Sequence, residues 1–131
     1  MHLDTRELGA IFAGGFIGAA LRAEVGELLA HAPGDWPWAT LLVNVAGAFL
    51  LGYFVTRLQE RLPLSAYRRP FLGTGVCGGL TTFSTMQIEL LQMLDAGRLA
   101  PAAAYAIISV MAGFAGVFVA TNLVRRTRLT A

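Results

Sequence analysis

The stretch from Pro70 to Ile88 constrains the fold more than any other part of the chain. It is uncharged for nineteen residues, which is long enough to cross about 30 Å of hydrocarbon as a helix. Its centre, however, is rich in glycine and hydroxyl side chains and reads GTGVCGGLTTFSTM. In lipid, an irregular backbone survives only where protein buries it or a wet cavity receives its free groups. The stretch therefore predicts a membrane helix that is broken mid-membrane and lines a polar feature.

The composition of the whole chain also favours a membrane protein. Of its 131 residues, 56% are hydrophobic and 14% are charged, and the mean hydropathy is +0.62, too apolar for a soluble domain of this size. The pattern predicts an all-α protein with four transmembrane helices, over residues 8–29, 38–57, 70–94 and 100–124. We expect one transmembrane domain over residues 1–131, whose first span stays attached because its flanks do not fit a cleavable signal peptide.

The arginines predict the orientation in the membrane. All ten basic residues are arginines, and eight lie on the side shared by both termini and the middle connection, against Arg22 and Arg98 on the other. Arginine-rich connections face the cytoplasm, so both termini are expected there, in a multi-pass protein of the cell (inner) membrane. The net charge of +2 is thus a topology signal. Nucleic-acid binding would need a basic face with stacking aromatics, and the sequence shows no such pattern.

Patterns for catalysis or metal binding by side chains are weak. His2 and His31 fall in a tail and a loop with no nearby cysteine or carboxylate cluster, and no nucleophile is paired with a base in a recognisable motif. An enzyme is therefore the poorer class. Because polar groups inside a bilayer are costly, they are the functional candidates: Arg22, Asn44, Thr81, Thr82, Ser84, Thr85, Glu89, Tyr105 and Ser109.

Each candidate also has a purely structural interpretation. Arg22 could extend to the lipid headgroups, Asn44 could join two helices, and a single serine or threonine usually satisfies its own backbone. The run from Thr81 to Thr85 is different, since it interrupts the helix at the depth where interruption costs most. Broken helices present ends that attract ions: N-termini favour anions and unwound carbonyls favour cations.

Two pairs of residues stand at helical spacing. Gly14 and Gly18 form a G-xxx-G pattern, which lets helix backbones approach closely in lipid. Phe83 and Met86 are three apart and would share one face beyond the break. Core packing is the simpler explanation for Phe83, but the positive edge of its ring could also face an anion.

The chain resembles the Fluc or CrcB family of small fluoride channels over most of its length. Three motifs carry the resemblance: GGFIGAALR, which ends at Arg22, WATLLVN, which ends at Asn44, and GTGVCGGLTTFSTM around the predicted break. Their order and spacing in a chain of four predicted spans make the resemblance strong.

The resemblance implies a fluoride-selective channel that exports cytoplasmic fluoride passively and protects against its toxicity. It implies an antiparallel, dual-topology dimer with two pores and a structural Na⁺ on the dimer axis, held by the backbone carbonyls of Gly78 and Thr81, and no organic cofactor. A hard cation prefers such oxygen ligands. The ion pathway it implies comprises Asn44, Phe83, Met86, Arg22, Thr40, Thr82, Ser84, Glu89, Tyr105 and Ser109.

Two features depart from the family pattern. Met86 stands where the family has a second phenylalanine, and a thioether cannot reproduce a ring edge. The arginine bias is also strong for a chain that inserts in both orientations. An antiparallel heterodimer with an oppositely oriented paralogue therefore stays open beside the homodimer.

Two other functions remain as alternatives. A small multidrug-type transporter also has four helices, but it expects a carboxylate within the first span, whereas Glu24 and Glu27 lie near the end of that span. A non-transporting membrane scaffold subunit would use the small-residue stripes for packing alone.

Overall fold

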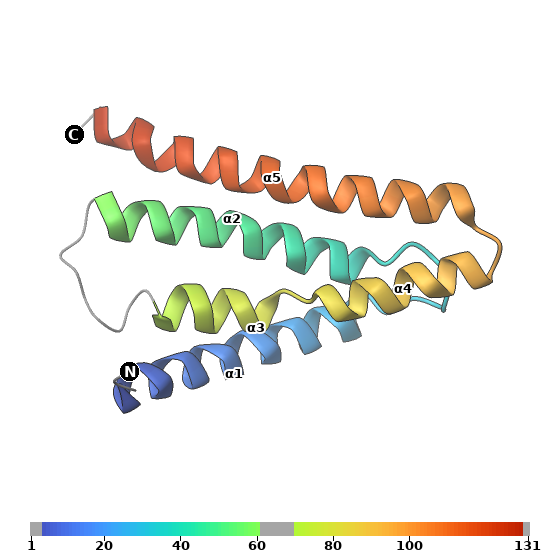
Figure 1. Cartoon of the computed structure of the whole chain (residues 1–131), viewed down its shortest axis with the longest axis horizontal. Coiled ribbons are helices and arrows are strands. Elements are labelled where there is room, and N and C mark those ends of the chain that lie inside the picture. The colour runs from blue at the N-terminus through green and yellow to red at the C-terminus, as the bar shows by residue number, and fades with distance from the viewer. Residues whose placement is uncertain (1–3, 61–69, 130–131) are drawn as a thin grey trace.

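The chain folds into long helices that lie side by side (Figure 1). The computed structural model describes residues 4–60 and 70–129. Within these ranges the elements are α1 (Thr5–Leu28), α2 (Trp38–Glu60), the π-helical segment η1 (Pro70–Cys77), α3 (Gly78–Leu80), α4 (Phe83–Asp95) and α5 (Leu99–Leu129). In Figure 1, η1, α3 and α4 follow one another along a third rod, which lies between α1 and α2.

The predicted spans are confirmed for three of the helices. Stretches over Thr5–Leu28, Trp38–Arg57 and Leu99–Arg126 are each long and apolar enough to cross a membrane. The first helix begins earlier than the predicted residue 8, because the Asp4 side chain caps it and accepts a hydrogen bond from the Arg6 amide at 2.9 Å. The third rod occupies the predicted region from Pro70 onward but is not one continuous helix.

Helix α1 packs along η1 and α3 through glycines, as the G-xxx-G pattern predicts. Gly14 and Gly18 are buried, and a Cβ added at either would collide with backbone oxygens of η1, from Phe71 and Val76 respectively. A Cβ at Gly75 would likewise lie 2.9 Å from the Gly14 Cα atom. The two backbones are therefore in direct contact, which side chains larger than hydrogen would prevent.

The rest of the molecule packs around α2 and α5. These two helices lie along each other, and α4 contacts α5. A small core of Leu41, Met93, Ala102 and Tyr105 joins all three. Large apolar side chains elsewhere on α1 and α5 point outward, including Phe12 at 76% and Phe114 at 75% exposure, as expected for surfaces that face lipid.

Both ends of the bundle agree with the predicted topology. The start of α1, the end of α2, the start of η1 and the end of α5 lie at one end of the molecule (Figure 1). At the other end, Arg98 donates a hydrogen bond to the Asp35 carboxylate at 2.9 Å and another to the Gly34 carbonyl. Gly34 and Gly97 have positive φ angles of 88° and 75°, which glycine adopts without steric cost.

Candidate functional site

The third rod is broken at Thr81 and Thr82. The sequence predicts a break within the run from Gly78 to Thr85. Helix α3 continues through Leu80, so the break lies at Thr81 and Thr82, inside that run. Thr81 and Thr82 have extended backbones, with ψ angles of 154° and 115°. The hydroxyl of Thr82 accepts a hydrogen bond from the Thr85 amide at 3.2 Å and so caps α4. Hydroxyl capping, more than glycine content, decides where the helix stops.

The side chain of Asn44, on α2, forms hydrogen bonds with the main chain at the break. The Asn44 Oδ1 atom accepts a hydrogen bond from the Thr82 amide at 2.7 Å, and its Nδ2 atom donates to the Thr82 carbonyl at 3.1 Å. Both backbone groups of Thr82 would otherwise lack a helical partner, which is costly away from water. The predicted need of Asn44 for a partner is met by Thr82. One N–H of the amide is left over from this pair.

Arg22 of α1 faces the break instead of extending away from it. Its Nε atom donates to the Gly79 carbonyl at 3.1 Å. Arg22 also lines a cavity of about 260 Å³ together with the hydroxyl residues Thr40, Thr82 and Thr85. Thr40 donates its hydroxyl proton to Glu89, and Thr82 donates its own to Thr85. The guanidinium group and the Thr85 hydroxyl are therefore the donors in this cavity that can face an anion.

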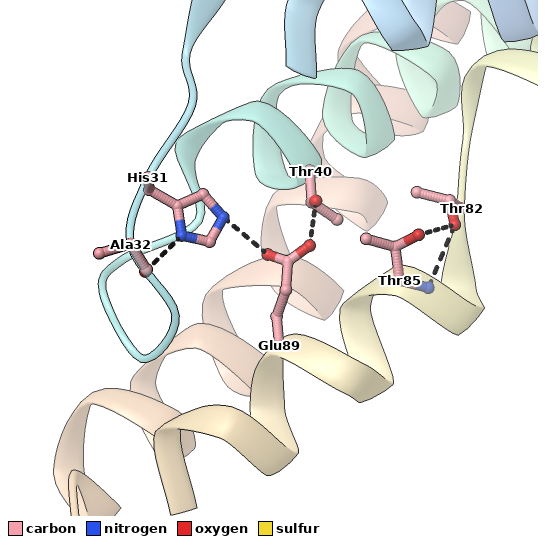
Figure 2. Close-up of polar contacts among 6 residues, drawn as sticks. All are labelled: His31, Ala32, Thr40, Thr82, Thr85 and Glu89. Carbon is pink, nitrogen blue, oxygen red and sulfur yellow. Dashed lines mark hydrogen bonds and ion pairs between the residues drawn. The ribbon is translucent and has the colours of Figure 1, made fainter. Parts of the chain in front are cut away.

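A second polar cluster lies further along α4, centred on Glu89. The Glu89 side chain is buried, at 6% exposure, and its Oε1 atom accepts a hydrogen bond from Thr40 of α2 (Figure 2). Tyr105 of α5 is fully buried in the adjoining core. Within the described residues, the Tyr105 hydroxyl, the Ser109 hydroxyl one turn further along α5, and the Glu89 Oε2 atom are buried without a hydrogen-bond partner. Such unpaired groups are rare and mark a place where a water or an ion is held.

On the other side of the break, an open groove of about 610 Å³ runs beside α2 and η1. Its polar lining comes from Asn44, Thr74, Thr81 and Thr82, and Phe83 forms one wall with 67% of its surface exposed. Gly78 also lines it, and a Cβ there would meet no atom within 4 Å.

Met86 and Ser84 differ from Phe83 in their surroundings. Met86 is partly buried and packs against the core of Leu41, Met93, Ala102 and Tyr105. Phe83 and Met86 are three residues apart on α4, yet their surroundings differ: Met86 packs against the core, and Phe83 is largely exposed in the groove. Ser84 is exposed at the start of α4.

Sequence reasoning missed one residue of the site and left another out of the implied ion pathway. His31 is not isolated from carboxylates: its Nε2 atom lies 3.7 Å from Glu89 Oε2 (Figure 2). The two residues are far apart in the sequence, so no local pattern could reveal the contact. Thr85 belongs to the predicted hydroxyl run but not to the implied ion pathway, yet it lines the Arg22 cavity and accepts a hydrogen bond from the Thr82 hydroxyl at 3.0 Å.

Together these features define a multi-pass helical membrane protein whose third rod is interrupted among part-buried hydroxyl, amide and guanidinium groups. Comparison with known proteins makes the class specific. Residues 9–121 match the family described as CrcB-like protein, Camphor Resistance (CrcB), and the chain belongs to this family.

Several characterised relatives are similar over nearly the whole chain. The chain is 59% identical over 126 residues to the fluoride-specific ion channel FluC 1 of Mycobacterium bovis and to that of Mycobacterium tuberculosis, with 96% of each chain covered. It is 39% identical over 123 residues to the fluoride-specific ion channel FluC 2 of Nocardia farcinica, covering 94% of this chain and 88% of the relative. The family implied by the three sequence motifs is confirmed.

Proposed function

We propose that this chain is a fluoride-selective channel that lets fluoride leave the cytoplasm down its electrochemical gradient. The observation that carries the proposal is the 59% identity, over 96% of both chains, to proteins named fluoride-specific ion channels. The polar break is what such a function needs, because a membrane-buried pathway requires groups that replace the water around the ion.

Two of the polar regions offer successive places for an anion. The cavity lined by Arg22, Thr40, Thr82 and Thr85 attracts anions through one guanidinium and offers the Thr85 hydroxyl as a further donor. Thr40 also belongs to the Glu89 cluster, so it connects the cavity to the unpaired hydroxyls of Tyr105 and Ser109. Selectivity follows from a narrow series of weak donor sites, since an ion held too tightly does not leave.

The Asn44 and Phe83 side chains form a separate part of the pathway at the groove. The Asn44 amide has one N–H beyond its bond to Thr82, and the exposed ring of Phe83 presents its positive edge beside it. Met86 packs against the core beside this part of the pathway and contributes to the pathway from there. Ser84 faces outward at the start of α4, where a second copy of the chain could bring it into a pathway.

An antiparallel pair of chains is the assembly that suits the groove. Gly78 and Thr81 line it, and Thr81 has an extended backbone that directs its carbonyl away from a helical partner. Two carbonyls from one chain are too few for a hard cation, which takes about six oxygen ligands. Gly78 and Thr81 of two copies would hold a structural Na⁺ with more ligands, where the ion would join the chains and take no part in conduction.

The proposed function is tested with purified protein as the only protein in liposomes. Vesicles loaded with potassium fluoride should release fluoride rapidly after addition of a potassium ionophore, and vesicles loaded with potassium chloride should release almost none. Equal release of the two anions would overturn selectivity, and release no faster than from protein-free vesicles would overturn the channel.

The same preparation tests whether one chain is sufficient and whether Na⁺ matters. Flux from a single purified chain would support a homodimer, since a heterodimer needs its paralogue. Replacing all sodium by N-methylglucamine during purification should weaken the dimer and lower fluoride release. Unchanged release after exhaustive sodium removal would argue against the cation at Gly78 and Thr81.

A further inference from the structure

His31 stands at the outer end of the Glu89 cluster, where the loop before α2 meets α4. Its Nδ1 atom lies 2.9 Å from the Ala32 carbonyl oxygen, and its Nε2 atom lies 3.7 Å from Glu89 Oε2 (Figure 2). The His31 side chain is 24% exposed, whereas that of Glu89 is 7% exposed. The imidazole therefore connects solvent to a buried carboxyl group.

The hydrogen bond to Ala32 fixes the proton on one ring nitrogen. A carbonyl oxygen can only accept, so Nδ1 must be the donor in this contact. In a neutral imidazole, Nε2 would then carry a lone pair that faces Glu89 Oε2. If Glu89 were ionised as well, two acceptors would oppose each other with no proton between them.

A single additional proton removes this conflict. If the proton is on Nε2, the pair consists of an imidazolium and a carboxylate; if it is on Oε2, both partners are neutral. In either case the two side chains together carry no net charge. The buried Oε2 atom also gains the partner that it otherwise lacks.

Among the described residues, the other polar groups around the pair do not compensate the negative charge of Glu89. Thr40 donates to Glu89 Oε1 from α2, and the neutral Tyr105 phenol adjoins from α5. Arg22 of α1 is directed to the Gly79 carbonyl, and Asp35 is paired with Arg98 at 2.9 Å. Among the described residues, His31 is the side chain that forms an ion-pair contact with Glu89.

We propose that His31 and Glu89 share one proton, and that this proton keeps the route past Glu89 open to fluoride. The inference rests on the proposed fluoride conduction. When the proton is lost, Glu89 is an uncompensated buried carboxylate and repels the approaching anion strongly at short range. His31 is thus a positioning residue that acts through Glu89. In an antiparallel pair, the two copies of His31 would lie at opposite ends of the assembly.

The test is the pH profile of fluoride release from liposomes between pH 6 and pH 9, with equal pH on both sides. Wild-type release should fall by roughly tenfold across this range, since loss of the proton leaves a full charge near the path. Protein-free vesicles at each pH correct for leakage of hydrogen fluoride. Release that is constant with pH in the wild type would overturn the proposal.

Two substitutions at His31 separate a proton-sharing role from a structural one. His31→Gln removes the imidazole and should give lower release at pH 6 with a flat profile. His31→Arg supplies a permanent positive charge and should keep release high up to pH 9. His2→Gln, at the other histidine of the chain, is the matched control and should keep the wild-type profile.

The outcomes distinguish the two proposals. Fluoride release with the wild-type profile in both His31 variants overturns the role of His31 and leaves the channel function standing. Absence of release from the wild type at every pH overturns the channel and, with it, the proton-sharing pair. Size-exclusion profiles in detergent establish that each variant is folded, and His31→Arg alone carries the test if His31→Gln is not.

Discussion

At the scale of single residues, Asn44 shows how a broken helix can be stable inside a membrane. The break in the third rod leaves the amide and the carbonyl of Thr82 to find partners outside the helical ladder. Asn44 offers one acceptor and one donor at the end of the same side chain, at 2.7 and 3.1 Å from these groups. An amide side chain provides both, on two atoms bonded to the same carbon.

We expect Asn44→Ala to destabilise the folded protein by about 1–3 kcal/mol, because it leaves two backbone groups unpaired. The measurement is the fraction of protein that remains monodisperse in detergent after heating at a series of temperatures. Asn122→Ala, on α5 and away from the break, is the matched control and should have a much smaller effect. Equal losses in the two variants would contradict a special role for the pair of Asn44 and Thr82.

The need of Asn44 for a partner was predictable from the sequence, but the partner was not. An amide within an apolar span must be satisfied, which the composition of the span alone establishes. Its pairing with Thr82 joins residues 38 apart in sequence, and it depends on how α2 is rotated against α4. The contact of His31 with Glu89 has the same origin.

At the scale of helices, the close approach of α1 to η1 and α3 holds one half of the broken rod. The approach uses Gly14 and Gly18 on α1 and Gly75 and Gly79 on the rod. The other half of the rod, α4, contacts α5 instead. The two halves thus belong to different neighbours, and the break at Thr81 and Thr82 lies where the neighbours change.

We expect Gly18→Ala to destabilise the protein by about 1–3 kcal/mol, since its Cβ would overlap the Val76 carbonyl and force the helices apart. Gly9→Ala in the same helix is the matched control: its Cβ meets no atom within 4 Å, so alanine should be neutral or stabilise α1 by up to about 1 kcal/mol. Thermal stability in detergent measures both. A Gly18→Ala variant as stable as Gly9→Ala would show that the helices are not in backbone contact.

Much of this element arrangement could be predicted. Uncharged stretches locate the spans, the spacing of Gly14 and Gly18 identifies the tight helix face, and the run of glycines and threonines indicates a break. The exact break could not be derived from glycine content. Glycine weakens a helix by about 1 kcal/mol, and Gly78 and Gly79 remain helical because capping by Thr82 is available only further along.

At the scale of the whole molecule, the open groove beside the break is the surface that the second copy of the proposed dimer would cover. It contains the exposed ring of Phe83 next to the backbone of Thr81 and Gly78. An exposed apolar face of this kind could contact lipid, but the polar groups of the break beside it could not do so without cost. A protein partner that brings its own polar groups resolves this conflict.

We expect Gly78→Leu to leave the fold of each chain intact but to weaken the dimer. No atom of the chain lies within 4 Å of a Cβ at this position, so the side chain would project into the groove, and the backbone carbonyl proposed for Na⁺ would be retained. Light scattering coupled to size exclusion in detergent measures the mass. Gly113→Leu on α5, where a Cβ is equally unobstructed, should remain a dimer, and an unaffected Gly78→Leu dimer would exclude the groove as the interface.

The hydrogen bonds between Asn44 and Thr82 also determine which substitutions each of the two positions can accept in evolution. Position 82 contributes main-chain atoms to this contact. Every residue with a backbone N–H would therefore maintain it, and proline would not. Position 44 has no such freedom, because the donor and acceptor come from its side chain. A saturation library should therefore accept almost only asparagine at position 44 and many residues at position 82. Any remaining preference at position 82 should reflect only the capping of α4.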